Sequence, residues 1–484
     1  MSVAKHTVYN LAGSVIPIAV SVVTVPLYLK SIGLDRYGVL AICWLLVGYF
    51  NLFDFGLGKA TSQKLATMAR STSLERSRIF WTSALLSASL SLIAVLVFVA
   101  IAPTALGSIK LADPTLRKEV SGALPFLILA VPFGVMQSLL VGTLEGRREF
   151  LRINLILGIG AITTSVLPLL AALYVSRELP LLLATSLIGR AVMLVALAVS
   201  CVRAVKLHRP QLAERTHIKE LLRFGGWTTV SNIVGPILVF IDRFAIGAVL
   251  TAAALALYVA PFNLVSQLTV LPAALSSALL PRLAGEKMSN EAASLTLEAS
   301  RLLAFMITPA TIVMAIGAGW FLQLWLGAAN GQTAREPALV LLAGFWINSL
   351  ARMPFVKLQA SGRPDLIAKL HVAEIIPYFV LLYFFMKAFG LVGAAVAWSL
   401  RCSVDAVVMH RLARYDRATI LILVTHGFLV ASAVALAFLW PLVGPLRWPL
   451  AAFVGIMTAV VMLRSPPRQL DEMLAIPLSR LQSR

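Results

Sequence analysis

The stretch NLFDFGLGKATSQKLA (51–66) sets an Asp-Phe-Gly beside a Gly-Lys, two patterns that serve nucleotide binding in soluble proteins. In kinases the aspartate of Asp-Phe-Gly holds magnesium, and Gly-Lys ends the loop that wraps phosphates in many nucleotide hydrolases. That loop needs a glycine five residues before Gly58 and a Ser or Thr after Lys59, but Phe53 and Ala60 stand there. Neither a kinase glycine-rich loop nor a His-Arg-Asp segment accompanies the aspartate. The stretch therefore predicts no nucleotide site.

A second set of candidates consists of charged residues inside long apolar runs. The arginines of this kind are Arg190, Arg352 and Arg401, and the acids are Glu374 and Asp405. A charge within a membrane helix is costly and usually faces the interior of the helix bundle or a watery cavity. Asp405 follows Arg401 by four residues, so a structural ion pair on one helical face is as good an interpretation of Arg401 as a ligand site.

The composition explains what positions these residues. Hydrophobic residues make up 59% of the 484 residues and charged residues only 13%, about half the usual share of a soluble protein. The first apolar run, 8–29, contains no charge and is longer than the core of a signal peptide, so we expect it to remain as a helix. Runs of this length predict membrane-spanning helices.

The chain contains fourteen such runs, which predict an all-α polytopic membrane protein. They lie at 8–29, 37–57, 79–103, 121–143, 153–175, 179–202, 226–248, 254–280, 302–326, 337–358, 366–389, 391–409, 418–440 and 443–463.

The formal net charge of +20 comes mostly from Lys and Arg in the loops on the side of the N-terminus. In membrane proteins such loops stay in the cytoplasm, so we expect both termini there and no nucleic-acid partner. The cysteines Cys43, Cys201 and Cys402 are too far apart to suggest a disulfide framework or a metal site.

The two halves of the sequence also resemble each other. Gly146-Arg147 and Gly362-Arg363 follow the fourth helix of two successive sets of six, and Arg190 and Arg401 occupy similar places in their sets. Two parallel six-helix halves are a transporter design. We therefore expect an N-terminal half (1–202), a cytoplasmic linker (203–222), a C-terminal half (223–412), extra helices (413–463) and a cytoplasmic tail (464–484).

The opening segment VYNLAGSVIPIAVSVVTVPLYLKSIGLDRYGVL and the stretch 51–66 resemble the Wzx-type polysaccharide flippases of the multidrug/oligosaccharidyl-lipid/polysaccharide exporter superfamily. FIDRFAIGAVL (240–250) and ALYVAPFNLV (256–265) are similar to later segments of that family. The positions that carry the family signature, or that could act in gating, are Asp54, Gly56, Gly58, Asp242, Arg243 and Tyr258. For Asp54 capping of a helix end is favoured over cargo binding, and for Asp242-Arg243 structural anchoring is favoured over a gate.

The resemblance implies that the cargo is an undecaprenyl-diphosphate-linked oligosaccharide, moved from the cytoplasmic to the outer leaflet of a bacterial inner membrane by alternating access. Arginine stays charged and forks onto phosphate oxygens, so Arg190, Arg352 and Arg401 would line a basic cavity. Glu374 and Asp405 would then be counter-ions or sites of coupling to H+ or Na+.

The outward loops are short and hold only isolated acids, so we expect no enzyme and no cofactor. The expected partners are the lipid-linked oligosaccharide, membrane lipids, and the polymerase and other polysaccharide assembly proteins. Two alternatives stay open. One is a cation-coupled multidrug exporter of the same superfamily, although the first helix lacks the acid that such exporters often carry. The other is a membrane-embedded enzyme or scaffold of the polysaccharide pathway.

Overall fold

The computed structural model describes residues 3–68, 71–111, 113–211, 242–285 and 290–464. Throughout these ranges the chain forms helices and turns without strands, which confirms the predicted all-α class. Eleven helical spans among them are long and apolar enough to cross a membrane. They account for thirteen of the fourteen predicted runs, because α1 and α12 hold two runs each. The remaining run, 226–248, falls largely outside the described residues.

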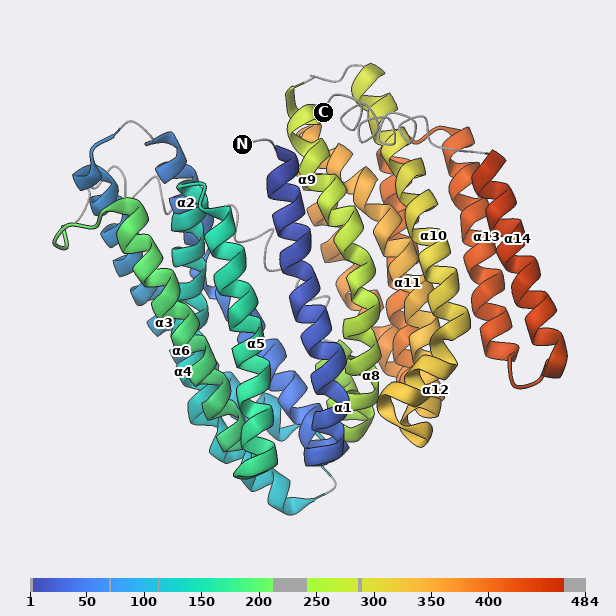
Figure 1. Ribbon diagram of the computed structural model, residues 1–484, viewed down its shortest axis with the longest axis horizontal. Helices are drawn as coiled ribbons and strands as arrows, with labels where there is room; N and C mark the ends of the chain where they lie inside the picture. Colours follow the sequence, from blue (N-terminus) through green and yellow to red (C-terminus); the bar gives the residue numbers. More distant parts are fainter. Residues whose placement is uncertain (1–2, 69–70, 112, 212–241, 286–289, 465–484) are drawn as a thin grey trace, which may run out of the picture. The chain divides into compact units, whose positions relative to one another are not determined.

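The chain divides into two compact units, Met1–Val259 and Ala260–Arg484 (Figure 1). In the N-terminal unit α4 packs against α2, α3 and α6, and α5 packs against α1 and α6. Its elements are α1 (Val3–Tyr49), η1 (Phe50–Asp54), α2 (Leu57–Thr67), α3 (Ser73–Gly107), α4 (Pro114–Gly146), α5 (Phe150–Tyr174), α6 (Leu179–Val205), a helical stretch at 242–249, and the start of α8 (Ala252–Val265).

In the C-terminal unit α11 packs against α9, α10 and α12, and α13 packs against α10. The elements after α8 are η2 (Ser266–Thr269), α9 (Val270–Gly285), α10 (Asn290–Leu326), α11 (Ala328–Ala360), α12 (Pro364–Leu412), α13 (Arg417–Leu439), η3 (Gly444–Leu446) and α14 (Arg447–Arg464). Contacts between side chains and neighbouring helices hold α13 in place. Arg301 of α10 donates to the Thr419 hydroxyl, and His426 Nδ1 lies 3.1 Å from Thr308 Oγ1.

Two glycines turn the chain within long helices. Gly33 divides α1 at φ 80°, and Gly390 divides α12 at φ 56°. Side chains other than glycine rarely adopt positive φ, so these positions allow two membrane segments to follow one another without a loop. The predicted pairs of runs in α1 and in α12 are therefore joined by one glycine each.

The same turn ends helices in both units. Glu149 N–H bonds to Leu144 O after a left-handed Arg148, and Arg363 N–H bonds to Leu358 O after a left-handed Gly362. This is the Schellman pattern of helix ends. It closes α6 and α12 as well, with Lys206 and Arg414 in the left-handed position. The matching turns align Arg148 with Gly362, two residues away from the match between Gly146 and Gly362 that the sequence suggests.

Large apolar side chains point outward on many helices. Val313, Leu324, Ile376 and Phe428 are each at least 70% exposed. Such exposure suits side chains that face lipid, because the bilayer removes the penalty that water imposes on them.

Candidate functional site

The signature aspartate Asp54 fixes the start of α2. Its Oδ1 accepts the backbone N–H of Gly56 at 2.7 Å, and its Oδ2 accepts that of Gly58 at 2.9 Å. Ser138 of α4 donates its hydroxyl to Oδ2. Gly56 has φ 74°, a conformation that favours glycine. Both carboxylate oxygens accept hydrogen bonds from the protein, so Asp54 caps the start of α2.

Gly58 also allows α2 and α4 to approach each other closely. A Cβ on Gly142 would lie 2.1 Å from Gly58 O, and a Cβ on Gly58 would lie 2.6 Å from Ser138 O. These distances are far below a normal contact, so both positions need glycine. The Asp-Phe-Gly-Leu-Gly pattern thus encodes a cap followed by a close contact between helices.

The second signature group lies around the helical stretch 242–249. Asp242 and Arg243 are buried, with 0% and 4% of their surfaces exposed. The Tyr258 hydroxyl donates to Asp242 Oδ2 at 3.3 Å, and the backbone N–H of Arg243 donates to Asp242 Oδ1 at 2.7 Å. This hydrogen bonding ties α8 to the stretch before it. A gating role for these residues stays a prediction.

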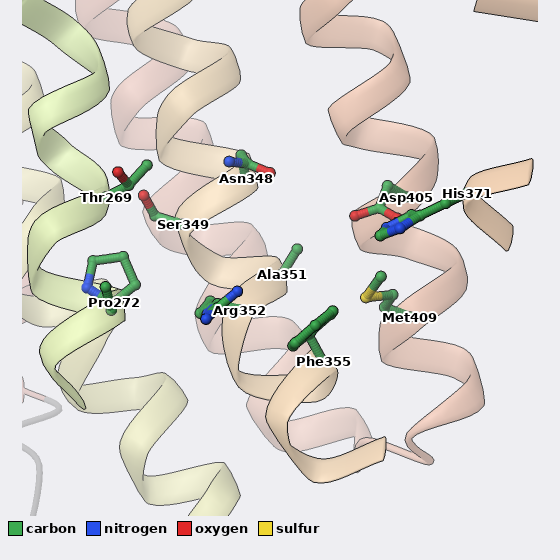
Figure 2. A pocket seen from close by; sticks show the side chains of 11 residues that line it. Thr269, Pro272, Asn348, Ser349, Ala351, Arg352, Phe355, His371, Asp405 and Met409 are labelled. Atoms are coloured by element: carbon green, nitrogen blue, oxygen red, sulfur yellow. The ribbon is translucent and has the colours of Figure 1, made fainter. Parts of the chain in front are cut away.

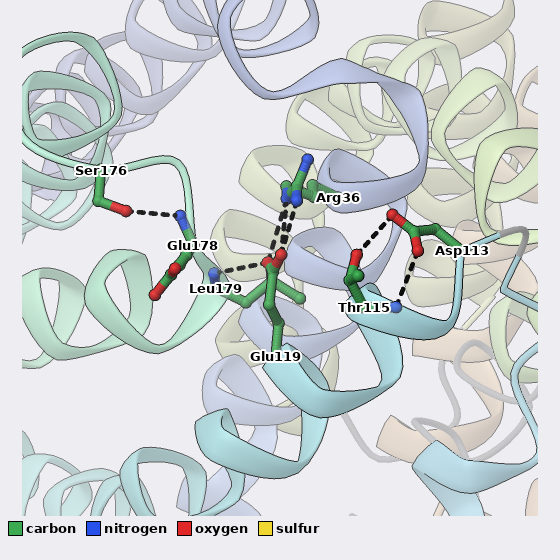
Figure 3. A network of polar contacts seen from close by, with 7 residues as sticks. All are labelled: Arg36, Asp113, Thr115, Glu119, Ser176, Glu178 and Leu179. Atoms are coloured by element: carbon green, nitrogen blue, oxygen red, sulfur yellow. Dashed lines mark hydrogen bonds and ion pairs between the residues drawn. The ribbon is translucent and has the colours of Figure 1, made fainter.

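An ion pair that the sequence did not predict joins three helices of the N-terminal unit (Figure 3). Arg36 of α1 donates two nitrogens to Glu119 of α4, with Nη2 at 2.6 Å from Oε1. Glu119 Oε2 also accepts the backbone N–H of Leu179, the first residue of α6. The available signal was an isolated arginine and an isolated acid, both assigned to loops on the same side of the membrane.

Close to this ion pair, Asp113 caps α4. Its Oδ1 accepts a hydrogen bond from the backbone N–H of Thr115 at 2.8 Å, and its Oδ2 accepts one from the Thr115 hydroxyl (Figure 3). These hydrogen bonds, helped by the charge of Arg36, lower the pKa of Asp113.

Arg190 lies midway along α6 and is half-buried. Within the described part of the chain it has no hydrogen bond and no ion pair. One turn earlier on α6, the Ser186 hydroxyl accepts a hydrogen bond from the indole nitrogen of Trp44 of α1, at 3.1 Å. An arginine without an acid keeps its full charge available for an anionic ligand.

The C-terminal unit contains a polar cavity of about 380 Å³ (Figure 2). Three segments line it. The segment of η2 and α9 contributes Thr269, Pro272 and Ala273; α11 contributes Asn348, Ser349, Ala351, Arg352 and Phe355; α12 contributes His371, Asp405 and Met409. Two of the predicted site residues, Arg352 and Asp405, therefore line the same cavity.

Arg352 is held in place before any ligand arrives. Its Nε donates to Ser276 Oγ at 3.3 Å, and its guanidinium carbon lies 4.9 Å from the centre of the Phe355 ring. These contacts use one nitrogen and one face of the Arg352 guanidinium group. Its two terminal nitrogens make no hydrogen bond within the described residues.

Arg401 is paired with an acid, but not with the one that the spacing favoured. Its Nη1 lies 3.3 Å from Glu374 Oε2, and the two side chains are only 10% and 7% exposed. Its guanidinium also lies 5.7 Å from the Tyr378 ring. The interpretation of Asp405 as the direct partner of Arg401 is wrong, because the chain turns at Gly390 and brings Glu374 to Arg401.

Asp405 instead faces His371, a residue that is not among the site residues predicted from the sequence. His371 Nε2 lies 3.5 Å from Asp405 Oδ1, a distance that gives an ion pair when the imidazole is protonated. The available signal was a histidine within the apolar run 366–389. The described part of the chain contains no cluster of three His, Cys, Asp or Glu side chains that could hold a metal ion.

Comparison with known proteins gives three findings. A family described as "Polysaccharide biosynthesis protein" matches residues 32–333. A putative O-antigen transporter of Shigella flexneri is 30% identical over 413 residues, which cover 85% of this chain and 98% of that protein. The fold is similar to solved structures of two transporters, each with a TM-score of 0.69.

The first of these structures is a multidrug resistance MATE family transporter of the MOP superfamily in an inward-facing conformation. It is 18% identical, and the match covers 86% of this chain and 94% of that one. The second is the lipid II flippase MurJ in an inward closed conformation. It is 12% identical, and the match covers 94% of this chain and 99% of that one. At these identities the two structures establish the fold alone.

Proposed function

The chain belongs to the polysaccharide biosynthesis protein family of membrane proteins, and on that premise we propose that it is a flippase for lipid-linked oligosaccharides. The cargo is an undecaprenyl-diphosphate-linked repeat unit, and it moves from the cytoplasmic to the outer leaflet of the inner membrane. The family predicted from the sequence is confirmed by these matches. Both termini then lie in the cytoplasm, as the distribution of Lys and Arg favours.

The observation that carries this proposal is the match to the putative O-antigen transporter, which extends over 98% of that protein. The structure supplies what such a transporter requires, namely many membrane spans and a polar cavity within them. A cargo with a diphosphate and sugars cannot cross lipid unaided, because unpaired charges and polar groups are costly there.

We assign the cargo contacts to Arg190 and Arg352. Both have guanidinium nitrogens without a partner in the described residues, whereas Arg401 is engaged by Glu374. Arg401 therefore acts on the cargo only if that pair opens, and otherwise neutralises Glu374. Glu374 and Asp405 are our candidates for coupling to H+ or Na+, since they are the acids within this part of the membrane region.

Alternating access between two six-helix halves completes the proposal. The matching helix ends at Arg148 and Gly362, and at Lys206 and Arg414, support an internal repeat of this kind. Polymerase and other polysaccharide assembly proteins are the expected partners on either side of the flipping step.

The test is a deletion strain that carries the gene on a plasmid. Without the protein, lipid-linked repeat units should accumulate on the cytoplasmic side and surface polysaccharide should disappear, and the plasmid should reverse both effects. Normal surface polysaccharide in the deletion strain would refute the proposal. A cation-coupled drug exporter would instead be indicated by increased drug susceptibility with unchanged polysaccharide, but no feature of the described structure favours it.

A further inference from the structure

The cavity of the C-terminal unit has the size of a small-molecule site. Its volume of about 380 Å³ lies within the usual range of about 300–1,000 Å³ for ligand pockets. A single water occupies about 30 Å³, so the cavity is far larger than one ion or one water needs.

The walls of the cavity carry polar groups that the protein leaves unsatisfied. Ser349 Oγ is buried and makes no hydrogen bond among the described residues, and Asp405 Oδ1 is buried with only His371 Nε2 near it, at 3.5 Å. Asn348, which is half-buried, makes none there either. Unsatisfied buried polar groups are rare in native proteins, so Ser349 and Asp405, with the half-buried Asn348 beside them, indicate a ligand that completes them.

The charges of the lining decide which part of a lipid-linked glycan fits. Arg352 contributes one positive charge and Asp405 one negative charge, and His371 is close to Asp405. A diphosphate carries negative charge on both phosphoryl groups and would meet the Asp405 carboxylate. A lone cation would meet the Arg352 guanidinium. Neither is matched by a lining whose formal charges cancel.

Sugars match this lining in three respects. Their hydroxyls both donate and accept, so they can donate to Asp405 and accept from Arg352 and Asn348. Their C–H faces suit the apolar parts of the wall, supplied by Pro272 and Met409. Arg352 is fixed by Ser276 and Phe355, which reduces the entropy lost on binding.

We propose that the cavity formed by η2, α9, α11 and α12 binds the glycan portion of the cargo and leaves the diphosphate to other residues. This inference rests on the proposed flippase function and assigns one part of its substrate.

The test measures binding of two probes to the purified full-length protein in lipid nanodiscs. One probe is the free oligosaccharide released by mild acid from the lipid-linked units of the host strain, and the other is inorganic pyrophosphate. Calorimetry should show that the oligosaccharide binds and that pyrophosphate does not displace it. Asp405→Asn and Asn348→Ala should each weaken oligosaccharide binding about tenfold, the effect expected from one lost hydrogen bond to a charged or buried group.

Asp365→Asn is the matched control, because Asp365 lies on the same helix as Asp405 but is exposed and outside the cavity. Asn348→Ala keeps the test valid if Asp405→Asn fails to fold, since Asn348 makes no hydrogen bond within the described residues. The inference is overturned if Asn348→Ala and Asp405→Asn bind the oligosaccharide as well as Asp365→Asn does, or if pyrophosphate displaces it. Those results would leave the flippase proposal standing, because that proposal fails only if the deletion strain exports normally.

Discussion

Arg401 and Glu374 belong to the same helix, α12, and their side chains lie 3.3 Å apart across its kink at Gly390. Both are almost completely buried, so each depends on the other to offset the cost of leaving water. The pair therefore links the two segments of α12 on either side of Gly390.

We predict that Glu374→Leu alone destabilises the protein by about 3–5 kcal/mol, because it leaves the Arg401 charge buried without a partner. The double variant Glu374→Leu/Arg401→Met should recover most of that loss. Thermal unfolding in detergent micelles measures both. Asp365→Leu, which disrupts an exposed ion pair on the same helix, should cost at most about 1 kcal/mol. Equal losses in the single and double variants would contradict the pairing.

The close contact between α2 and α4 gives a second prediction. Gly142→Ala should destabilise the protein by about 1–3 kcal/mol, since the new methyl group would lie 2.1 Å from Gly58 O and the helices would have to move apart. Gly48→Ala is the control, because a Cβ there meets nothing within 4 Å. The comparison uses thermal unfolding of the two variants, and a larger loss for Gly48→Ala would refute it.

The sequence predicts the spans well and the pairings poorly. Apolar runs reveal helices because lipid requires length and low charge, and these are visible in one dimension. The pairing of Glu374 with Arg401 depends on the direction in which the chain leaves Gly390, and no spacing rule expresses that. The rule for residues four apart favoured Asp405 instead. The ion pair between Arg36 and Glu119 could not be predicted for the same reason, since 83 positions separate the two residues.

The signature around Asp54 shows the opposite case. The Asp-Phe-Gly-Leu-Gly pattern could be located from the sequence because both its cap and its glycines act over a few residues. Local hydrogen bonding is visible in a sequence, whereas the approach of α4 through Ser138 and Gly142 is not.

The ion pair between Arg36 and Glu119 gives a third prediction. Arg36→Lys should destabilise the N-terminal unit although it keeps the charge, because lysine cannot donate two nitrogens to one carboxylate. We expect a loss of about 1–2 kcal/mol, since the pair is partly exposed. Lys118→Ala, one residue before Glu119 and exposed, should change little. If the two variants unfold at the same temperature, the contact of two Arg36 nitrogens with Glu119 contributes nothing beyond the charge.

A fourth prediction concerns acid stability through Asp416, the N-cap of α13. Hydrogen bonds from Thr419 lower the pKa of Asp416 below its usual value, and the charge of Arg301 helps. A carboxylate with a lowered folded pKa stabilises the fold at pH values above its unfolded pKa of about 3.9. That contribution disappears as the pH falls through the folded value.

Asp416→Asn keeps an acceptor for the cap but removes the charge. Wild type should therefore melt above this variant at pH 7, and the difference should shrink towards pH 3. A difference that grows on acidification would contradict the lowered pKa. Glu336→Gln removes the same charge at an exposed acid that makes no hydrogen bond or ion pair among the described residues, so it shows how much of the effect comes from net charge alone.

Arg190 gives the last prediction, and it separates a functional residue from a structural one. A half-buried arginine without an acid among the described residues costs stability, so Arg190→Ala should unfold at the same temperature as wild type or higher. The same variant should reduce the export of lipid-linked units roughly tenfold to a hundredfold, the value of a charge-assisted hydrogen bond to phosphate. Arg190→Lys should retain part of the activity, because it keeps the charge and loses the fork. Arg203→Ala, an exposed arginine near the end of the same helix, should export normally. If Arg190→Ala loses both stability and export, Arg190 is a packing residue. Unchanged stability with reduced export fits only a side chain that the cargo needs and the fold does not.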